Sequence, residues 1–223
     1  MILFENITTD SLANVTFSVD EGSVCKIIVN SDDEKDDLLQ TLTGLKPPVS
    51  GRVSLFGKEI YSIPRSELYI LFKRTGMVWR GSGLISNLKV WENITLPAWY
   101  HYGRKPAEQE EEIAGLFREL GRDVPYVEAL MQKPSGPLPL HEKILVNLVR
   151  ALMMAPELMI YDSLFEGFTS ETAKMLGTMV SRYHAEKEGR IALHVSSDEQ
   201  SLAHVKATNV LRQTGDTIQH DSN

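Results

Sequence analysis

The stretch VCKIIVNSDDEKDDLLQTLTG, residues 24–44, decides the expected fold. It opens with Val24 to Val29, a mostly apolar run that is typical of a short strand. After a polar segment, Leu38, Leu39 and Leu42 recur at helical spacing, and Gly44 followed by two prolines ends the helix. The stretch therefore predicts a strand, a loop and a helix in succession.

Strands and helices continue to alternate outside this stretch. Further strands are predicted at residues 12–19, 52–56, 74–79, 158–161 and 191–195, and helices at 141–154 and 170–188. Residues 84–133 carry helical patterns and an acidic run, which indicates a helical lobe with a solvated face. The alternation predicts an α/β fold in one compact unit.

The composition excludes several classes of protein. The 223 residues carry a net charge of −7 with acidic and basic residues mixed, whereas a nucleic-acid-binding protein needs a basic face. The single Cys25 cannot form an internal disulfide, and the N-terminus lacks the pattern of a signal peptide. The longest apolar stretch, residues 144–161, is interrupted by polar residues and a proline, so it does not predict a membrane span. We therefore expect a cytoplasmic protein that reaches a membrane only through a partner.

Four landmarks, taken in order, resemble the nucleotide-binding domain of ATP-binding-cassette (ABC) transporters over essentially the whole chain. They are the opening strand and turn at 12–22, the helix and strand at 38–53, the stretches 74–79 and 88–97 around the family's glutamine loop, and the helix, proline and strand at 150–162. The resemblance implies a P-loop NTPase-like (RecA-like) α/β core sheet with an inserted helical subdomain.

The same resemblance implies one domain of residues 1–223. Its core would comprise about 1–79 and 153–223, and its helical subdomain about 80–152. Residues 83–93 are similar to the corresponding stretch in ATPases of the phospholipid-shuttling type that work with MCE proteins.

The family's phosphate loop, G-x-x-x-x-G-K-[ST], aligns without a gap to residues 29–36. Its glycine positions hold Val29 and Glu34, its hydroxyl position holds Asp36, and only Lys35 is kept. The many carboxylates here would surround a triphosphate, and each like-charge pair in contact costs about 4 kcal/mol at an effective dielectric near 20. Ser31 and Glu34 form a capping-box pattern instead, with acidic residues stabilising the helix start. We favour this structural role over nucleotide binding.

The glutamine and signature motifs of the family have also changed. The glutamine position holds Arg80, which can donate hydrogen bonds but cannot coordinate a metal. The signature L-S-G-G-Q falls on residues 138–142, where Pro139, Leu140 and His141 replace the serine and the glycines. Pro139 removes a backbone N–H that would otherwise face a phosphate. The resemblance therefore implies that phosphate binding from an opposing subunit is impaired as well.

The catalytic positions follow the same trend. Asp162 keeps the magnesium-site carboxylate, but Ser163 stands where the family has its catalytic glutamate and Ser197 where it has its switch histidine. His194 lies nearby, although a lone histidine inside a strand is more often a packed residue than a catalyst. Residues 7–11 lack the aromatic residue that stacks on adenine in the family, and Phe4 is the one substitute that we consider.

These losses predict a catalytically silent subunit with no catalytic residue and no cofactor. Lys35 and Asp162 would be residual nucleotide-binding positions only. The alternative is an ATP-binding or ATPase subunit of an ABC transporter. A lipid transporter is one form of this alternative. The subunit would bind ATP and Mg weakly or act beside a competent partner ATPase.

The expected partners are a transmembrane permease and a second ABC domain, in a homodimer or a heterodimer. The chain would then lie on the inner face of the cell membrane. Candidate permease contacts are Trp79, Arg80, Leu84, Trp91 and Trp99. For any one of the apolar residues, packing within the helical lobe is the more common explanation. Arg80 is expected to form a salt bridge with a permease carboxylate.

Overall fold

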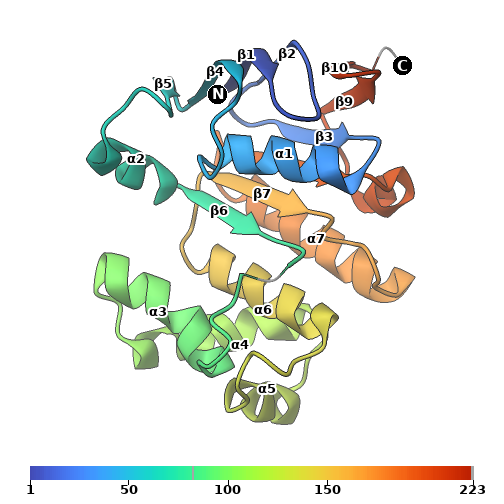
Figure 1. The fold of residues 1–223 in the computed structure, drawn as a ribbon. Helices are drawn as coiled ribbons and strands as arrows, with labels where there is room; N and C mark the ends of the chain where they lie inside the picture. The colour runs from blue at the N-terminus through green and yellow to red at the C-terminus, as the bar shows by residue number, and fades with distance from the viewer. Residues whose placement is uncertain (82, 222–223) are drawn as a thin grey trace.

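A six-stranded sheet forms the centre of the computed structural model, which describes residues 1–81 and 83–221 (Figure 1). The strand order is β10-β9-β3-β8-β7-β6, in which β10 pairs antiparallel with β9 and the other neighbours are parallel. The strands are β3 (Val24–Ile28), β6 (Thr75–Val78), β7 (Leu158–Asp162), β8 (Ile191–Ser196), β9 (Asn209–Thr214) and β10 (Thr217–His220). The predicted α/β fold is confirmed.

A second, antiparallel sheet with the order β2-β1-β4-β5 lies beside the main one at the top of Figure 1. It consists of β1 (Ile2–Thr8), β2 (Val15–Val19), β4 (Ser50–Leu55) and β5 (Lys58–Glu59). Apolar residues of this sheet, of α1 (Asp32–Leu42) and of one face of the main sheet form one buried cluster. Helix α1 is thereby fixed against the sheet, with its first turn beside the strand ends.

Alternate residues of β7 face two different cores. Leu158 and Ile160 pack with α1 and the second sheet, whereas Met159 and Tyr161 pack with α6 (Leu140–Leu152) and α7 (Ser170–Ala185). A strand covered on both faces needs an uninterrupted apolar run, which residues 158–161 provide. The run ends at Asp162, at the carboxyl edge of the sheet.

The helical lobe lies below the sheet in Figure 1. It contains α3 (Val90–Tyr102), η1 (Pro106–Gln109), α4 (Glu110–Glu119) and α5 (Val124–Met131), and two short helices lie elsewhere, α2 (Arg65–Phe72) and η2 (Glu199–His204). The helices predicted within residues 84–133 are therefore present from Val90 onward. The acidic run is exposed along η1 and the start of α4, as expected.

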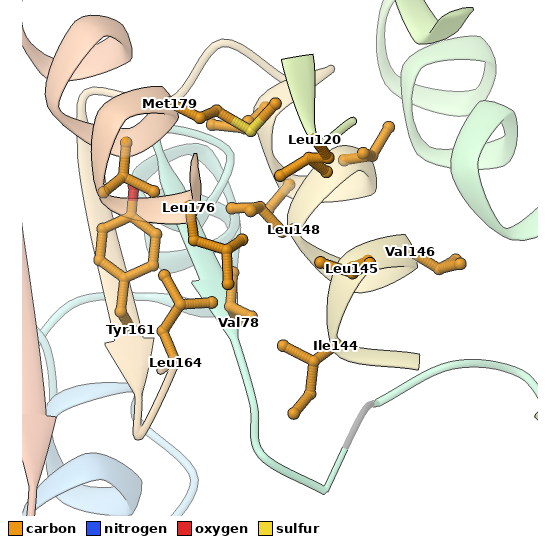
Figure 2. Close-up of a cluster of buried hydrophobic side chains, with 14 of the residues drawn as sticks. Val78, Leu120, Ile144, Leu145, Val146, Leu148, Tyr161, Leu164, Leu176 and Met179 are labelled. Carbon is orange, nitrogen blue, oxygen red and sulfur yellow. The ribbon is translucent and has the colours of Figure 1, made fainter. Parts of the chain in front are cut away.

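Helix α6 joins the lobe to the sheet. Residues 144–149 of this helix are all buried, because the helix packs against neighbours on every side. Figure 2 shows the resulting cluster, from Leu120 of the lobe through Leu148 to Tyr161 and Leu176. One continuous hydrophobic core spans the lobe and the sheet. The subdomain boundaries near residues 79 and 153 remain a proposal.

None of the helices in the described part of the chain combines the length and the apolar character needed to cross a bilayer. The apolar stretch at 144–161 is divided between α6 and β7 instead, and both are packed inside the protein.

Candidate phosphate-binding site

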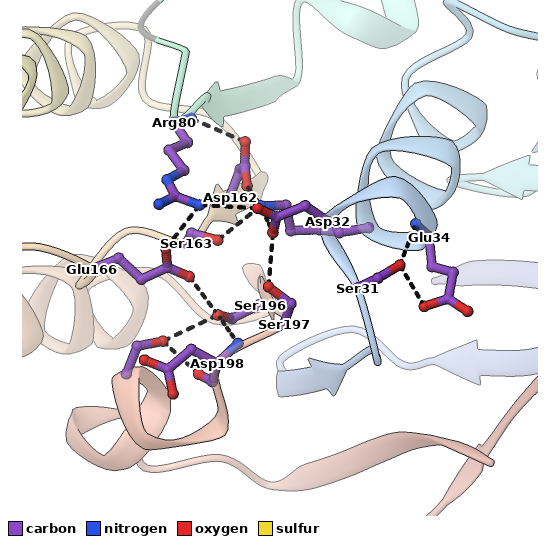
Figure 3. Close-up of polar contacts among 12 residues, drawn as sticks. Ser31, Asp32, Glu34, Arg80, Asp162, Ser163, Glu166, Ser196, Ser197 and Asp198 are labelled. Carbon is purple, nitrogen blue, oxygen red and sulfur yellow. Dashed lines mark hydrogen bonds and ion pairs between the residues drawn. The ribbon is translucent and has the colours of Figure 1, made fainter. Parts of the chain in front are cut away.

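The carboxyl ends of β6, β7 and β8 meet the first turn of α1 at one edge of the main sheet. Asp32 lies in that turn, Arg80 follows β6, Asp162 and Ser163 come at the end of β7, and Ser197 follows β8 (Figure 3). In open α/β sheets, ligands bind at this edge because the strand ends and helix starts converge there. Motif positions far apart in the sequence are therefore neighbours in the fold.

Lys35 is the buried centre of this arrangement, with 2% of its side chain exposed. Its Nζ lies 2.9 Å from Oδ1 of Asp32 and 3.1 Å from Oδ1 of Asp162, and it donates a hydrogen bond of 3.1 Å to Oγ of Ser163. Burial alone would lower the pKa of Lys35, but the contacts with Asp32 and Asp162 outweigh it and raise the pKa. The ammonium group is thus held charged, with partners from its own chain.

Helix α1 begins at Asp32, three residues before Lys35, with Ser31 as its N-cap. Oγ of Ser31 accepts the Glu34 amide at 3.3 Å and donates to Oε2 of Glu34 at 2.8 Å. The carbonyl of Ser31 accepts the Lys35 amide at 3.1 Å. One half of the predicted capping box is present, and the Glu34 carboxylate accepts from the Ser31 hydroxyl instead of from the Ser31 backbone N–H. The backbone amides of Glu34 and Lys35 are therefore hydrogen-bonded to the N-cap residue of their own helix.

Gln213 on β9 holds the same segment from the side. Its Oε1 accepts the Asn30 amide at 2.9 Å, and its Nε2 donates to Oε1 of Glu34 at 2.7 Å. The side chain is buried and lies 179 positions from Glu34 in the sequence. Sequence reasoning missed this residue because no local pattern connects a late strand to the loop after β3.

Side chains from three segments of the chain contact the carboxylate of Asp32 as donors. Its Oδ1 accepts from Nζ of Lys35 and, at 2.7 Å, from Oγ of Ser197, while Oδ2 lies 3.3 Å from Nη1 of Arg80. The hydrogen bonds from Lys35 and Ser197 lower the pKa of Asp32. The carboxylate is therefore the point at which α1 and the loops after β6 and β8 meet.

Arg80 bridges two carboxylates of its own chain. Its Nη1 lies 2.9 Å from Oε2 of Glu166 as well as near Asp32, and its backbone N–H donates to Oδ2 of Asp162 at 3.0 Å. The guanidinium is 41% exposed and these ion pairs use only Nη1, so a salt bridge from Arg80 to a permease stays a prediction. Glu166 had not been singled out in the sequence. It also accepts a hydrogen bond of 2.9 Å from Ser196.

Comparison with known proteins assigns the family. A family profile described as ABC transporter matches residues 12–166.

The chain belongs to the ABC transporter family.

Its relatives include methionine import ATP-binding proteins. The chain is 27% identical over 164 residues to the methionine import ATP-binding protein MetN of Cereibacter sphaeroides, covering 74% of this chain and 45% of the relative. It is 31% identical over 170 residues to MetN 2 of Paraburkholderia xenovorans, covering 76% and 42%. The chain thus spans less than half the length of these relatives.

Solved ABC cassettes share the fold over nearly the entire chain. A dimeric cassette, MJ0796, in a post-hydrolysis state with ADP and Pi, has a TM-score of 0.84 at 19% identity and covers 99% of this chain and 98% of that one. The protein cbiO1 from Clostridium perfringens, part of the ABC transporter complex cbiONQ, has a TM-score of 0.75 at 19% identity and covers 98% and 86%. The fold expected from the resemblance is confirmed.

The residues at the predicted phosphate-loop and magnesium positions differ from the family's pattern. The phosphate loop presents free amides and a serine or threonine hydroxyl, whereas here the amides of Glu34 and Lys35 are bonded and Asp36 replaces the hydroxyl. Burial raises the pKa of Asp36 despite the nearby Lys35 charge. Within residues 1–81 and 83–221, no group of three His, Cys, Asp or Glu side chains is arranged to hold a metal.

A cavity of about 530 Å³ borders the site, and both charged and apolar side chains line it. Asp32, Asp36 and Asp162 contribute carboxylates, and Leu140 at the start of α6 closes it on the lobe side. Leu140 is 51% exposed and stands at a signature position. Lys35 and Arg80 line the same cavity, so an approaching phosphate would meet carboxylates, an apolar side chain and two cations that are already in ion pairs.

The structure places the residues predicted at the remaining signature and phosphate-loop positions as follows. Pro139 is the N-cap of α6 without a side-chain hydrogen bond, and His141 is exposed one residue into the helix. Val29 is buried, and its amide donates to the carbonyl of Ser196 at 3.1 Å. Ser163 has a positive φ of 49°, and its hydroxyl accepts from Lys35.

Two aromatic positions near the site are packing residues. His194 on β8 is 2% exposed and stacks on Tyr161 with ring centroids 4.5 Å apart, as the sequence indicated. The suggestion that Phe4 stacks on adenine is wrong. Phe4 is fully buried and stacks on Phe17 at 4.6 Å.

The permease candidates differ in exposure. Trp79, Leu84 and Trp91 are partly buried against the two cores, whereas Trp99 on α3 is 55% exposed. A cavity of about 270 Å³ lies between α2, β6, α3 and α6 and is lined on α3 by Pro97 and His101. Further exposed aromatic residues occur on α2 and α3, namely Tyr69, Tyr100 and Tyr102. Exposed aromatic side chains of this kind are suited to a protein interface.

We predict that Lys35→Met destabilises the fold by about 3–5 kcal/mol, because Asp162 would keep a buried charge without its partner. Urea unfolding measures the loss, and Lys35→Met/Asp162→Asn should recover part of it. Lys58→Met is the matched control, since Lys58 forms an exposed ion pair with Glu67 and its loss should cost about 0–1 kcal/mol. Equal losses of unfolding free energy in Lys35→Met and Lys58→Met would refute a structural role for Lys35.

We also predict an acid-sensitive contribution from His194. Burial lowers the pKa of His194 from 6.5 to about 3, so the unfolded chain binds a proton that the folded chain excludes. This contribution is complete above pH 6.5 and is lost as the pH falls toward 3, by at most about 1.4 kcal/mol per pH unit. His194→Phe should flatten the pH dependence of the unfolding free energy in this range. His141→Gln, at an exposed position, should not. An unchanged slope in His194→Phe contradicts the prediction.

Proposed function

We propose that this chain is an ABC transporter ATP-binding-domain subunit that docks to a membrane permease and does not hydrolyse ATP itself. The family profile and the import proteins among its relatives support the transporter part. The observation that carries the second part is Lys35, which is buried and bound to Asp32 and Asp162 of its own chain.

The amide cradle supports the loss of phosphate binding. A phosphate loop works because free backbone N–H groups point at the phosphates. In this chain the helix starts at Asp32, so the amides of Glu34 and Lys35 bond to Ser31. Binding a triphosphate would require unwinding the first turn of α1 and breaking the ion pairs of Lys35.

The hydrolytic machinery supports the same proposal. Hydrolysis needs a general base that activates water, and Ser163 next to Asp162 has no carboxylate to offer. The nearby Glu166 is bound to Arg80 and Ser196. The switch position holds Ser197, whose hydroxyl donates to Asp32. Glu166 and Ser197 are thus both engaged in the network, and we expect no cofactor.

A second candidate function is an ATP-binding or ATPase subunit that retains weak nucleotide binding or acts beside a competent ATPase. The relatives named as ATP-binding proteins favour it, as does the retention of Lys35 and Asp162. ATP and Mg would be its cofactors. The contacts within the site favour the silent subunit, and the names of the relatives favour the second candidate.

The partner in either case would be a transmembrane permease, with a second ABC domain as homodimer or heterodimer. The dimeric cassette and the cbiONQ component among the solved structures support such an assembly. The chain would then be cytoplasmic and peripheral on the inner face of the membrane. Because the relatives are named for methionine import, they support an import system and give no support to the phospholipid-shuttling type.

A nucleotide titration decides between the two candidates. The full chain, mixed with Mg and a fluorescent ATP analogue, should show no saturable binding in the micromolar range and no ATP turnover. A competent ABC ATPase measured in parallel is the positive control. Saturable micromolar binding by this chain alone would overturn the silent subunit and establish the second candidate.

Affinity purification from native membranes tests the docking surface. The tagged chain should recover an integral membrane protein with the permease topology of an ABC transporter, and Trp99→Ala should reduce that recovery several-fold. Val124→Ala, at a 56% exposed position on α5, is the matched control and should recover as much as the unchanged chain. Equal recovery with Trp99→Ala would refute this surface, and recovery without any permease would contradict the transporter assignment.

A further inference from the structure

Asp32 makes contacts that a capping residue does not need. An acidic residue in the first turn of a helix is stabilised by the helix dipole without any side-chain partner. Asp32 nevertheless binds Nζ of Lys35 at 2.9 Å, Oγ of Ser197 at 2.7 Å and Nη1 of Arg80 at 3.3 Å. Both of its carboxylate oxygens are used, by donors from three separate segments.

The neighbouring Asp33 shows that these contacts are specific. It occupies the same helical turn and has the same relation to the helix dipole. In the described part of the chain, however, its side chain is exposed and has no ion pair or hydrogen bond. Position within the turn, and not charge alone, therefore gives Asp32 its partners.

The three donors coincide with three motif positions of the family. Lys35 is the phosphate-loop lysine, Arg80 stands at the glutamine position and Ser197 at the switch position. In the family, these positions face the terminal phosphate and its metal. Here they face one carboxylate, which is an oxyanion with the charge and the acceptor oxygens that such donors recognise.

We propose that Asp32 is a tethered intramolecular ligand that takes the place of a phosphoryl group and blocks the site against oxyanions. The inference rests on the proposed function, because it explains how the silent site is kept closed. It also assigns Asp32 a second effect: the carboxylate joins α1 to the loops after β6 and β8, so the site stays in one arrangement without nucleotide.

The charges of the site support this assignment. Two cations, Lys35 and Arg80, contact three carboxylates, those of Asp32, Asp162 and Glu166, and Asp36 lines the same cavity, so carboxylates outnumber cations. A further anion is repelled by that balance. Removing the Asp32 carboxylate removes one negative charge and leaves three donors without their shared acceptor. The side chain of Asp32 is 55% exposed, so a small oxyanion can enter from solvent to replace it.

Anion rescue tests the proposal. The full chain carrying Asp32→Ala should unfold about 2–4 °C lower than the unchanged chain, in line with the loss of a charged contact in a protein of this size. Acetate and inorganic phosphate should then raise its unfolding temperature saturably, beyond the effect of chloride at equal ionic strength. The unchanged chain and Asp33→Ala should respond to all three anions alike.

Two results would overturn the inference. One is that Asp32→Ala unfolds at the same temperature as Asp33→Ala. The other is that the unfolding temperature of Asp32→Ala responds to acetate and phosphate no more than to chloride. If Asp32→Ala does not fold, Asp32→Asn provides the same comparison, because it removes the charge and keeps the shape. Rescue by acetate in a protein that also binds ATP tightly before mutation would refute both the silent subunit and the blocking role of Asp32. Absent rescue with absent ATP binding would refute the role of Asp32 alone.

Discussion

A buried ammonium group needs a counter-charge, and this requirement shapes the site. Lys35 has 2% of its side chain exposed, and a charge so far from water is tolerated only when it is paired and hydrogen-bonded. Asp162 supplies the pairing from the end of β7, and Asp32 supplies it from the turn that precedes Lys35. Because α1 begins at Asp32, that carboxylate lies one turn before Lys35 and within reach of Nζ.

The ABC fold is maintained by interactions that do not depend on this site. Its sheet order, the two-sided burial of β7 and the packing of α6 between lobe and sheet involve apolar residues away from the strand ends. Nucleotide chemistry depends on a small number of residues at the carboxyl edge. A chain can therefore keep the fold and its docking surfaces while that edge changes, which is consistent with the general independence of fold and function.

Much of the fold was predictable from local patterns. The apolar runs at 24–29 and 158–161, the leucine spacing after Lys35 and the stop at Gly44 each depend on a few adjacent residues. The motif positions could be placed by counting from these landmarks. The position of Lys35, Arg80, Asp162, Ser163 and Ser197 at one edge then followed from parallel strands.

The contacts of the site were not predictable, because they join distant segments. Arg80 and Asp32 are 48 residues apart, and Gln213 reaches Glu34 across 179. Neither pair has a sequence signature. Phe4 is a related case, since no local pattern shows that β1 pairs it with Phe17 on β2. A crystal structure grown with Mg and a non-hydrolysable ATP analogue tests the account most directly. It should show Nζ of Lys35 between the carboxylates of Asp32 and Asp162. Phosphoryl oxygens bound to Nζ, with Asp32 displaced, would contradict it.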